Sequence, residues 1–143
     1  MKNNIEILIP TLNEEGNIEK VINELKATGY NNITILDANS TDQTVKIATD
    51  YGCRIILDGP NITGFGGSVI NGLKNLNHDY FCIFDGDNSF DPIAISEMLK
   101  EISNGTDFAF GTRYLKGTKS DDDTLITKFG NFFFTKLVRL LFK

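Results

Sequence analysis

Two carboxylates, Asp85 and Asp87, flank Gly86 directly after the apolar run 80–84. Hard divalent cations such as Mg²⁺ and Mn²⁺ are held in proteins by one or two carboxylates together with the phosphate oxygens of a ligand. A glycine between the two lets the backbone approach such a ligand closely. The spacing therefore favours a metal site that carries a diphosphate, although an aspartate-rich turn ahead of a helix capped by Asp91 fits the same residues.

Further polar residues follow other apolar runs, and an open parallel sheet binds its ligands beyond the carboxyl ends of its strands. The segment 11–14 follows the first run. Asp37 follows the second, where it either accepts hydrogen bonds from a nucleobase or ribose or serves as a turn residue. Arg113 follows the run 107–110, and its planar donor fork suits a phosphate or a surface ion pair. The glycine-rich segment 64–67 opens a predicted helix and could present N–H groups to a phosphate.

The elements that would position these residues alternate along the chain. Apolar runs with β-branched residues are followed by segments of helical period, which is typical of β-α-β units. The predicted fold class is α/β, with a mostly parallel sheet sandwiched by helices. The strands are expected at 5–9, 33–36, 53–57, 80–84 and 107–110, the first ended by Pro10 because proline has no N–H for the ladder. The helices are expected at 14–26, behind Ser40 or Thr41 up to Gly52, at 64–76, at 92–103 and at 124–143.

Composition narrows the class of protein. The 143 residues predict one domain with an ordinary packed core. A net charge of -5 disfavours nucleic acid as a partner, because binding it needs many cations. Cys53 and Cys82 lie in apolar runs and are expected to be free structural thiols, as in the reducing cytosol. The single histidine, His78, is expected to be a solvated loop residue, so a Ser-His-Asp triad is not expected.

The end of the chain differs in character from the rest. Residues 116–123 are polar and include three consecutive aspartates, which predicts a mobile loop. Residues 124–143 project as an amphipathic helix, with apolar residues such as Phe129, Phe133 and Leu137 on one side and basic residues on the other. Such a helix fits an interface beside anionic lipid, and it also fits packing on the domain or against a second copy. No apolar run reaches the roughly 20 residues that a membrane span needs.

Four segments in order resemble the family 2 glycosyltransferases of GT-A fold: Pro10 to Glu14, Ile35 to Thr44, Phe84 to Asp87, and Gly111 to Tyr114. Within that family the chain is similar to the polyprenyl-phosphate sugar transferases of the dolichyl-phosphate mannosyltransferase type. These carry the same Gly-[Ser/Thr]-Arg-Tyr motif, a loop, and a Gly-Asn-containing helix, as at 128–131. The resemblance divides the chain into a nucleotide-sugar-binding core (1–115), an acceptor-side loop (116–123) and an amphipathic helix (124–143).

The resemblance implies an inverting transfer from a UDP- or GDP-sugar to a polyprenyl phosphate at the cytoplasmic membrane surface, with Mg²⁺ or Mn²⁺. The implied catalytic residues are Asp85, Asp87 and Arg113. The implied donor-binding residues are Pro10, Thr11, Asn13, Glu14, Asp37, Asn39, Gly64, Asp85 and Gly86. The implied metal ligands are Asp85, Asp87 and Ser89, and the acceptor phosphate is expected to meet Arg113 and Lys128.

Two alternatives stay open from the sequence. One is transfer to a sugar hydroxyl in surface-polysaccharide synthesis, and the other is a catalytically silent module that binds nucleotide or membrane. Family members continue beyond the position where this chain stops, so a fragment, a truncated gene product or half of a partnership is expected. Self-association through the Phe-rich helix is a further expectation.

Overall fold

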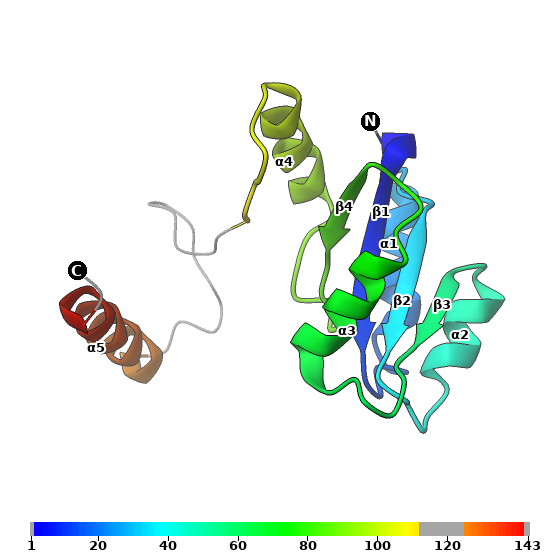
Figure 1. Ribbon diagram of the computed structural model, residues 1–143, viewed down its shortest axis with the longest axis horizontal. Coiled ribbons are helices and arrows are strands. Elements are labelled where there is room, and N and C mark those ends of the chain that lie inside the picture. Colours follow the sequence, from blue (N-terminus) through cyan, green and yellow to red (C-terminus); the bar gives the residue numbers. More distant parts are fainter. Residues whose placement is uncertain (1, 112–124, 142–143) are drawn as a thin grey trace. The chain divides into compact units, whose positions relative to one another are not determined.

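A computed structural model describes residues 2–111 and 125–141 of the chain (Figure 1). It contains two compact units, Met1–Ala109 and Phe110–Lys143, and each is described by itself. In the first unit the elements are a 3-10 turn Lys2–Asn4, β1 Ile5–Thr11, α1 Ile18–Ala27, β2 Ile33–Asp37, α2 Thr44–Asp50, β3 Arg54–Leu57, α3 Gly64–Lys74, β4 Tyr80–Ile83 and α4 Ile93–Ser103. In the second unit α5 spans Leu125–Leu141.

The described strands form one parallel sheet of four strands in the order β3-β2-β1-β4. The register pairs Thr11 of β1 with Asp37 of β2, and Asp37 with Leu57 of β3. On the other side of β1, Leu8 pairs with Ile83 of β4. All four strands therefore end at the same edge of the sheet, which we call the carboxyl edge.

Helices cover both faces of this sheet, which confirms the expected layers. The alternate residues Ile5, Ile7 and Ile9 of β1 face a buried cluster to which α1, α2 and α4 contribute. On the opposite face α3 packs so closely that a β-carbon at Gly72 would lie 2.6 Å from the side chain of buried Leu36. Figure 1 shows α3 on the near side of the sheet and α1 behind it. The absence of a side chain at position 72 sets this spacing.

Pro10 does not end the first strand as expected, because β1 runs on to Thr11. In a parallel strand successive residues direct their N–H groups to opposite neighbours. Odd residues of β1 face β2, as the bond from the Ile7 amide to the Asn32 carbonyl shows, and even residues face β4. Since β4 ends at Ile83, the missing N–H of Pro10 costs no ladder bond.

The expected strand at 107–110 is wrong, because these residues form no strand in the structure. Its pattern of aromatic and small residues indicates extended chain, but a strand also needs a neighbour with which to exchange hydrogen bonds. Phe108 and Phe110 are instead exposed, at 68% and 86%. Two helices also begin later than expected, at Ile18 and Thr44, because the polar residues ahead of them form loops.

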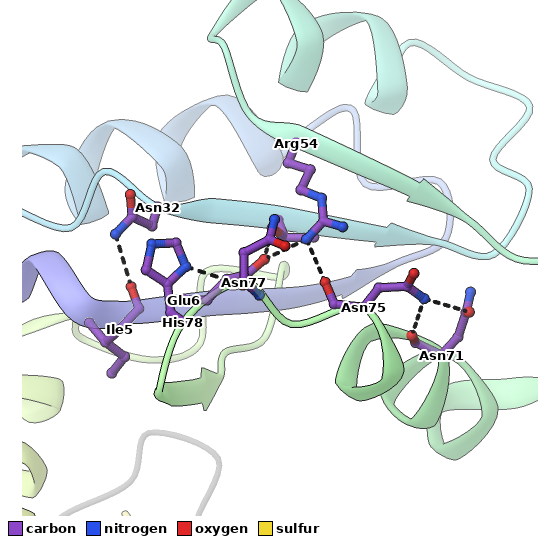
Figure 2. A network of polar contacts seen from close by, with 9 residues as sticks. Ile5, Glu6, Asn32, Arg54, Asn71, Asn75, Asn77 and His78 are labelled. Carbon is purple, nitrogen blue, oxygen red and sulfur yellow. Dashed lines mark hydrogen bonds and ion pairs between the residues drawn. The ribbon is translucent and has the colours of Figure 1, made fainter.

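A buried carboxylate stabilises the opposite, amino edge of the sheet (Figure 2). Glu6 of β1 is 2% exposed. Within the described residues, its Oε1 accepts hydrogen bonds from the Thr34 hydroxyl at 2.6 Å and from Arg54 at 3.1 Å. Its Oε2 accepts from the Asn77 amide at 2.9 Å and lies 3.3 Å from Nδ1 of His78. Burial raises the pKa of the Glu6 carboxyl, but these hydrogen bonds lower it by more, so it lies below its usual range.

The Glu6 network corrects the expectation for His78, which is not a solvated loop residue. Its side chain is 26% exposed and its ring pairs with the buried carboxylate. Arg54 also donates to the Asn75 carbonyl at 2.7 Å, so the network joins three strands to the loop between α3 and β4. A strand pattern cannot show this, because the partners of Glu6 lie 28 to 72 residues away in sequence.

The second unit contains the amphipathic helix that the sequence predicts. Most large apolar side chains of α5 are exposed, among them Phe129 at 72% and Leu140 at 77%. Lys136 places its ammonium group 4.8 Å from the centre of the Phe132 ring. None of the helices among the described residues has the length and apolar character that crossing a membrane requires.

Candidate functional site

The carboxyl edge brings together several residues that the sequence singled out, and Asp37 lies at its centre. Asp37 ends β2 and is 1% exposed. Its carboxylate accepts hydrogen bonds from the Ser40 amide at 2.8 Å and the Ser40 hydroxyl at 2.5 Å, and from the Thr11 hydroxyl at 3.4 Å. A buried carboxylate needs such partners to offset lost hydration. Asp37 therefore fixes the turn after β2 against the end of β1.

The loops after β1 and β2 are joined by reciprocal hydrogen bonds. Asn13 has a φ of 57°, in the left-handed region that asparagine tolerates better than most residues. Its amide donates to the Ser40 hydroxyl at 2.9 Å, and its side-chain oxygen accepts from the Thr41 amide at 2.8 Å. The Glu14 amide donates to the Thr44 hydroxyl at 2.8 Å. Ser40 and Thr41 thus bind the neighbouring loop and do not cap α2.

Asp42 and Glu15 extend this pairing of the two loops. Asp42 accepts from the amides of Glu15 at 3.1 Å and Thr44 at 2.9 Å, and Glu15 accepts from the Gln43 amide at 2.9 Å. Partial desolvation raises the pKa of the Asp42 carboxyl, and hydrogen bonds from Thr44 and Glu15 lower it by more. Backbone N–H groups that would otherwise face water are satisfied, so both loops have a defined shape.

The acidic loop 85–87 lies against the end of β1. A β-carbon at Gly86 would lie 3.2 Å from Cγ2 of Thr11 and 3.3 Å from Cγ2 of Ile9, closer than most side chains tolerate. The absence of a side chain at Gly86 lets the loop pack closely here, beside the Thr11 and Asp37 pair. Asp85 is half-buried and Asp87 is exposed, and Asp87 accepts a hydrogen bond from the Ser89 amide at 2.9 Å.

The donor set of this loop suits a hard divalent cation carried by a phosphate ligand. Asp85 and Asp87 provide carboxylate oxygens, which Mg²⁺ and Mn²⁺ prefer. Among the residues that the structure describes, no group of three or more His, Cys, Asp or Glu side chains is assembled for a metal. A cation here would therefore complete its coordination with ligand oxygens and water. Ser89 is exposed next to the loop, and its role as a ligand stays a prediction.

The remaining expected site residues fall into two groups. Gly64 begins α3 with a φ of 68°, Asn39 has a φ of 64°, and Pro10 lies next to Thr11 in β1, so all three belong to the carboxyl edge. Arg113, the loop 116–123 and the side chain of Lys128 lie outside the described residues. Asp91 accepts from the Ile93 amide at 2.9 Å, which confirms its capping role ahead of α4.

The sequence reasoning missed one buried carboxylate at this edge. Asp58 directly follows β3 and is 5% exposed. Glycine, proline and asparagine follow Asp58, and this composition is typical of a turn, in which an aspartate is usually exposed. The signal that could have found it is its position, since Asp37 is the last residue of β2 and Asp85 lies two residues after β4.

The chain belongs to glycosyltransferase family 2, because the family model described as Glycosyl transferase family 2 matches residues 6–143. Solved structures of glycosyltransferases share its fold, which confirms the expected GT-A class. One is glucosyl-3-phosphoglycerate synthase of Mycobacterium tuberculosis in complex with Mn²⁺, UDP-glucose and phosphoglyceric acid. It aligns with a TM-score of 0.63 at 25% identity, over 71% of this chain and 40% of that one.

The curated relatives that are at least 30% identical include two whose lengths this chain covers to different extents. The dolichol-phosphate mannosyltransferase of Pyrococcus furiosus is 30% identical over 125 residues, covering 82% of this chain and 35% of that protein. Protein RfbJ of Shigella flexneri is 32% identical over 119 residues, covering 82% of this chain and 91% of RfbJ. The chain thus spans about a third of the Pyrococcus protein and most of the Shigella one.

Proposed function

We propose that this chain binds the donor and the divalent cation of an inverting glycosyltransferase that transfers a sugar to a polyprenyl phosphate. The observation that carries the proposal is the packing of the acidic loop 85–87 on Thr11, beside the loops held by Asp37. This arrangement sets two carboxylates next to a rigid polar edge at the place where parallel sheets bind nucleotides.

The metal ligands in this proposal are Asp85 and Asp87, with Ser89 as a third candidate. A bound Mg²⁺ or Mn²⁺ supplies Lewis-acid stabilisation of the negative charge on the departing diphosphate. The Mn²⁺ and UDP-glucose bound by the mycobacterial synthase support both the metal and a uridine nucleotide. The donor is therefore a uridine- or guanosine-diphosphate sugar, and we place uridine first.

The nucleoside is proposed to lie along the loops after β1 and β2. The donor-binding residues are Pro10, Thr11, Asn13, Glu14, Asp37, Asn39, Gly64, Asp85 and Gly86. Hydrogen bonds that already satisfy Asp37 and Asn13 keep these loops in shape, which reduces the entropy lost on binding.

In the reaction a phosphate oxygen of the acceptor attacks the anomeric carbon while the bond from that carbon to the diphosphate oxygen breaks. Attack from the face opposite the leaving group inverts the anomeric configuration. A lipid monophosphate, with a second pKa of about 6, is mostly dianionic at neutral pH and needs no general base. Arg113 and Lys128 are proposed to bind the anionic phosphate of this acceptor. The dolichol-phosphate mannosyltransferase among the relatives supports this class of acceptor.

The helix α5 is proposed to bind the cytoplasmic face of the membrane. The helix exposes Phe133 at 57% and Phe134 at 65%, and it carries Lys136 and Arg139. Apolar side chains beside cations are what an interfacial helix needs on anionic lipid.

Calorimetry of UDP- and GDP-sugars with and without Mn²⁺ tests donor binding. The wild-type protein is expected to bind one of these two kinds of nucleotide sugar, and to do so only with Mn²⁺. Asp85→Asn and Asp87→Asn are expected to weaken that binding by at least about tenfold. Asp50→Asn, an exposed carboxylate of α2, is the matched control and should bind as wild type does. Binding that is unchanged by EDTA, or by both site variants, would contradict the proposal.

Acceptor choice is tested with anionic vesicles that contain polyprenyl phosphate. Transfer to the lipid is expected, and Phe133→Gln should reduce vesicle binding while Thr135→Gln, which adds no charge, should not. Transfer to a soluble glycan that survives Phe133→Gln would identify a sugar hydroxyl as the acceptor. Donor binding without turnover on either acceptor would identify a silent module.

A further inference from the structure

Asp58 is a buried carboxylate whose two oxygens are both bound by α3. Its Oδ1 accepts from the Asn71 side-chain amide at 3.0 Å, and its Oδ2 accepts from the hydroxyl of Ser68. Ser68 is itself 2% exposed. Because a buried carboxylate depends on its hydrogen bonds, the position of α3 and the position of Asp58 are coupled.

The backbone of Asp58 is bound in turn by the neighbouring strand and loop. Its amide donates to the Asp37 carbonyl at 2.9 Å. Its carbonyl accepts from the Asn39 side chain at 3.2 Å. Asn39 holds a left-handed φ of 64°, so its side-chain hydrogen bond is part of what maintains the loop. Asp58 therefore connects α3 to the end of β2 and to the loop that follows it.

The part of α3 held in this way is its glycine-rich start. Ser68 lies directly after Gly64–Gly67, and its hydroxyl also lies 3.3 Å from the Gly64 carbonyl. A β-carbon at Gly67 would lie 3.1 Å from Cγ2 of Ile62, so the chain entering the helix packs closely against it. Movement of Ser68 would move this whole start relative to the β2 loop.

We propose that Asp58 is a positioning residue for the nucleotide, which fixes Asn39 and the start of α3 relative to Asp37. The inference rests on the proposed donor site, because Asn39 and Gly64 are two of its residues. A direct electrostatic role would have the opposite sign, since a carboxylate repels an anionic diphosphate. Positioning and charge therefore predict different results for the same substitutions.

Three variants separate the two roles. Asp58→Ala removes both acceptors and should weaken nucleotide binding by roughly tenfold, as expected for the loss of positioning worth about 1.4 kcal/mol. Asp58→Asn removes the charge but can keep the pattern, with its oxygen accepting from Asn71 and its amide donating to the Ser68 hydroxyl. It should therefore bind within about threefold of wild type. Ser68→Ala removes one hydrogen-bond donor, and its loss of nucleotide affinity should lie between the losses of Asp58→Ala and Asp58→Asn.

The matched control is Thr34→Val at the opposite edge of the sheet. Thr34 is 1% exposed and donates to the buried Glu6, as Ser68 donates to the buried Asp58. Both substitutions delete one buried hydroxyl, so they should reduce stability to urea similarly, but only Ser68→Ala should weaken nucleotide binding. Equal effects on binding would overturn the proposal. So would equal weakening by Asp58→Ala and Asp58→Asn, or no weakening by any Asp58 or Ser68 variant.

Amide hydrogen exchange keeps this inference separate from the proposed function. Without nucleotide, Asp58→Ala should speed exchange at 38–41 and in the first turn of α3, and Thr34→Val should not. If Asp58→Ala does not fold, Ser68→Ala carries the same comparison. If wild type binds no nucleotide, the proposed function fails, and exchange alone decides whether Asp58 holds these two segments. Unchanged exchange at both segments would refute the inference.

Discussion

Replacing Glu6 with glutamine removes the charge from a carboxylate that, among the described residues, binds four groups (Figure 2). Glutamine has one acceptor oxygen, and its amide must face one of the two donor pairs. If the amide faces Thr34 and Arg54, Arg54 has no acceptor there, and if it faces Asn77 and His78, the Asn77 amide has none. At least one charge-assisted bond is lost in either orientation, and we expect a loss of about 2–4 kcal/mol.

The loss depends on pH in a defined direction. The pKa of Glu6 is lowered in the folded protein, so the carboxylate contributes its full stability above the unfolded pKa of about 4.3. That contribution is lost as pH falls through the folded pKa. The difference between wild type and Glu6→Gln should therefore be constant near neutral pH and shrink below about pH 4.

Urea unfolding followed by circular dichroism measures this difference at pH 7 and at pH 3. Asp79→Asn is the control, because Asp79 is an exposed carboxylate near the same edge that accepts a bond from Asn4 at 2.6 Å. It should change stability by less than about 1 kcal/mol. A loss below about 1 kcal/mol for Glu6→Gln at pH 7, or a loss that persists undiminished at pH 3, would refute the reasoning.

Three further predictions concern packing and reactivity. Gly72→Ala should destabilise the fold by about 1–3 kcal/mol in urea, because its β-carbon would lie 2.6 Å from a buried leucine, whereas Gly16→Ala, with no atom within 4 Å, should be nearly neutral. Burial raises the pKa of Cys82 to about 11, so its reaction with a disulfide reagent at pH 8 should be at least about 100-fold slower in the folded protein than in urea. Tyr30→Phe removes a hydroxyl 2.9 Å from that of Ser96 and should cost about 1 kcal/mol, and an unchanged midpoint would disprove that contribution of α4.

Sequence reasoning predicted the alternation of strands and helices well, because each element has its own apolar period. The strands β1 to β4 and the helices α3 and α4 lie close to where the residues placed them. The failure at 107–110 has a physical cause, since apolar character shows that a segment can be a strand but not whether a neighbour is available.

The candidate site was predictable in part. Asp37, Asn13 and Asp85 were found because polar residues that end strands share one edge. Glu6 was missed because its partners, such as Thr34 and Arg54, are distant in sequence. Asp58 was missed because the residues after it have turn composition, although it directly follows β3. Only the three-dimensional register shows that each of these carboxylates joins separate parts of the chain.

Pro10 in β1 has a consequence for where the shorter neighbouring strand β4 leaves the sheet. Extending the pairing of β4 by one step would require a donor at position 10, and the imino acid has none. The exit point of the segment that carries Asp85 and Asp87 thus depends on a residue some 75 positions earlier as well as on the segment's own Gly86. A residue with an amide hydrogen at position 10 would let the ladder lengthen and draw those two acids toward the sheet.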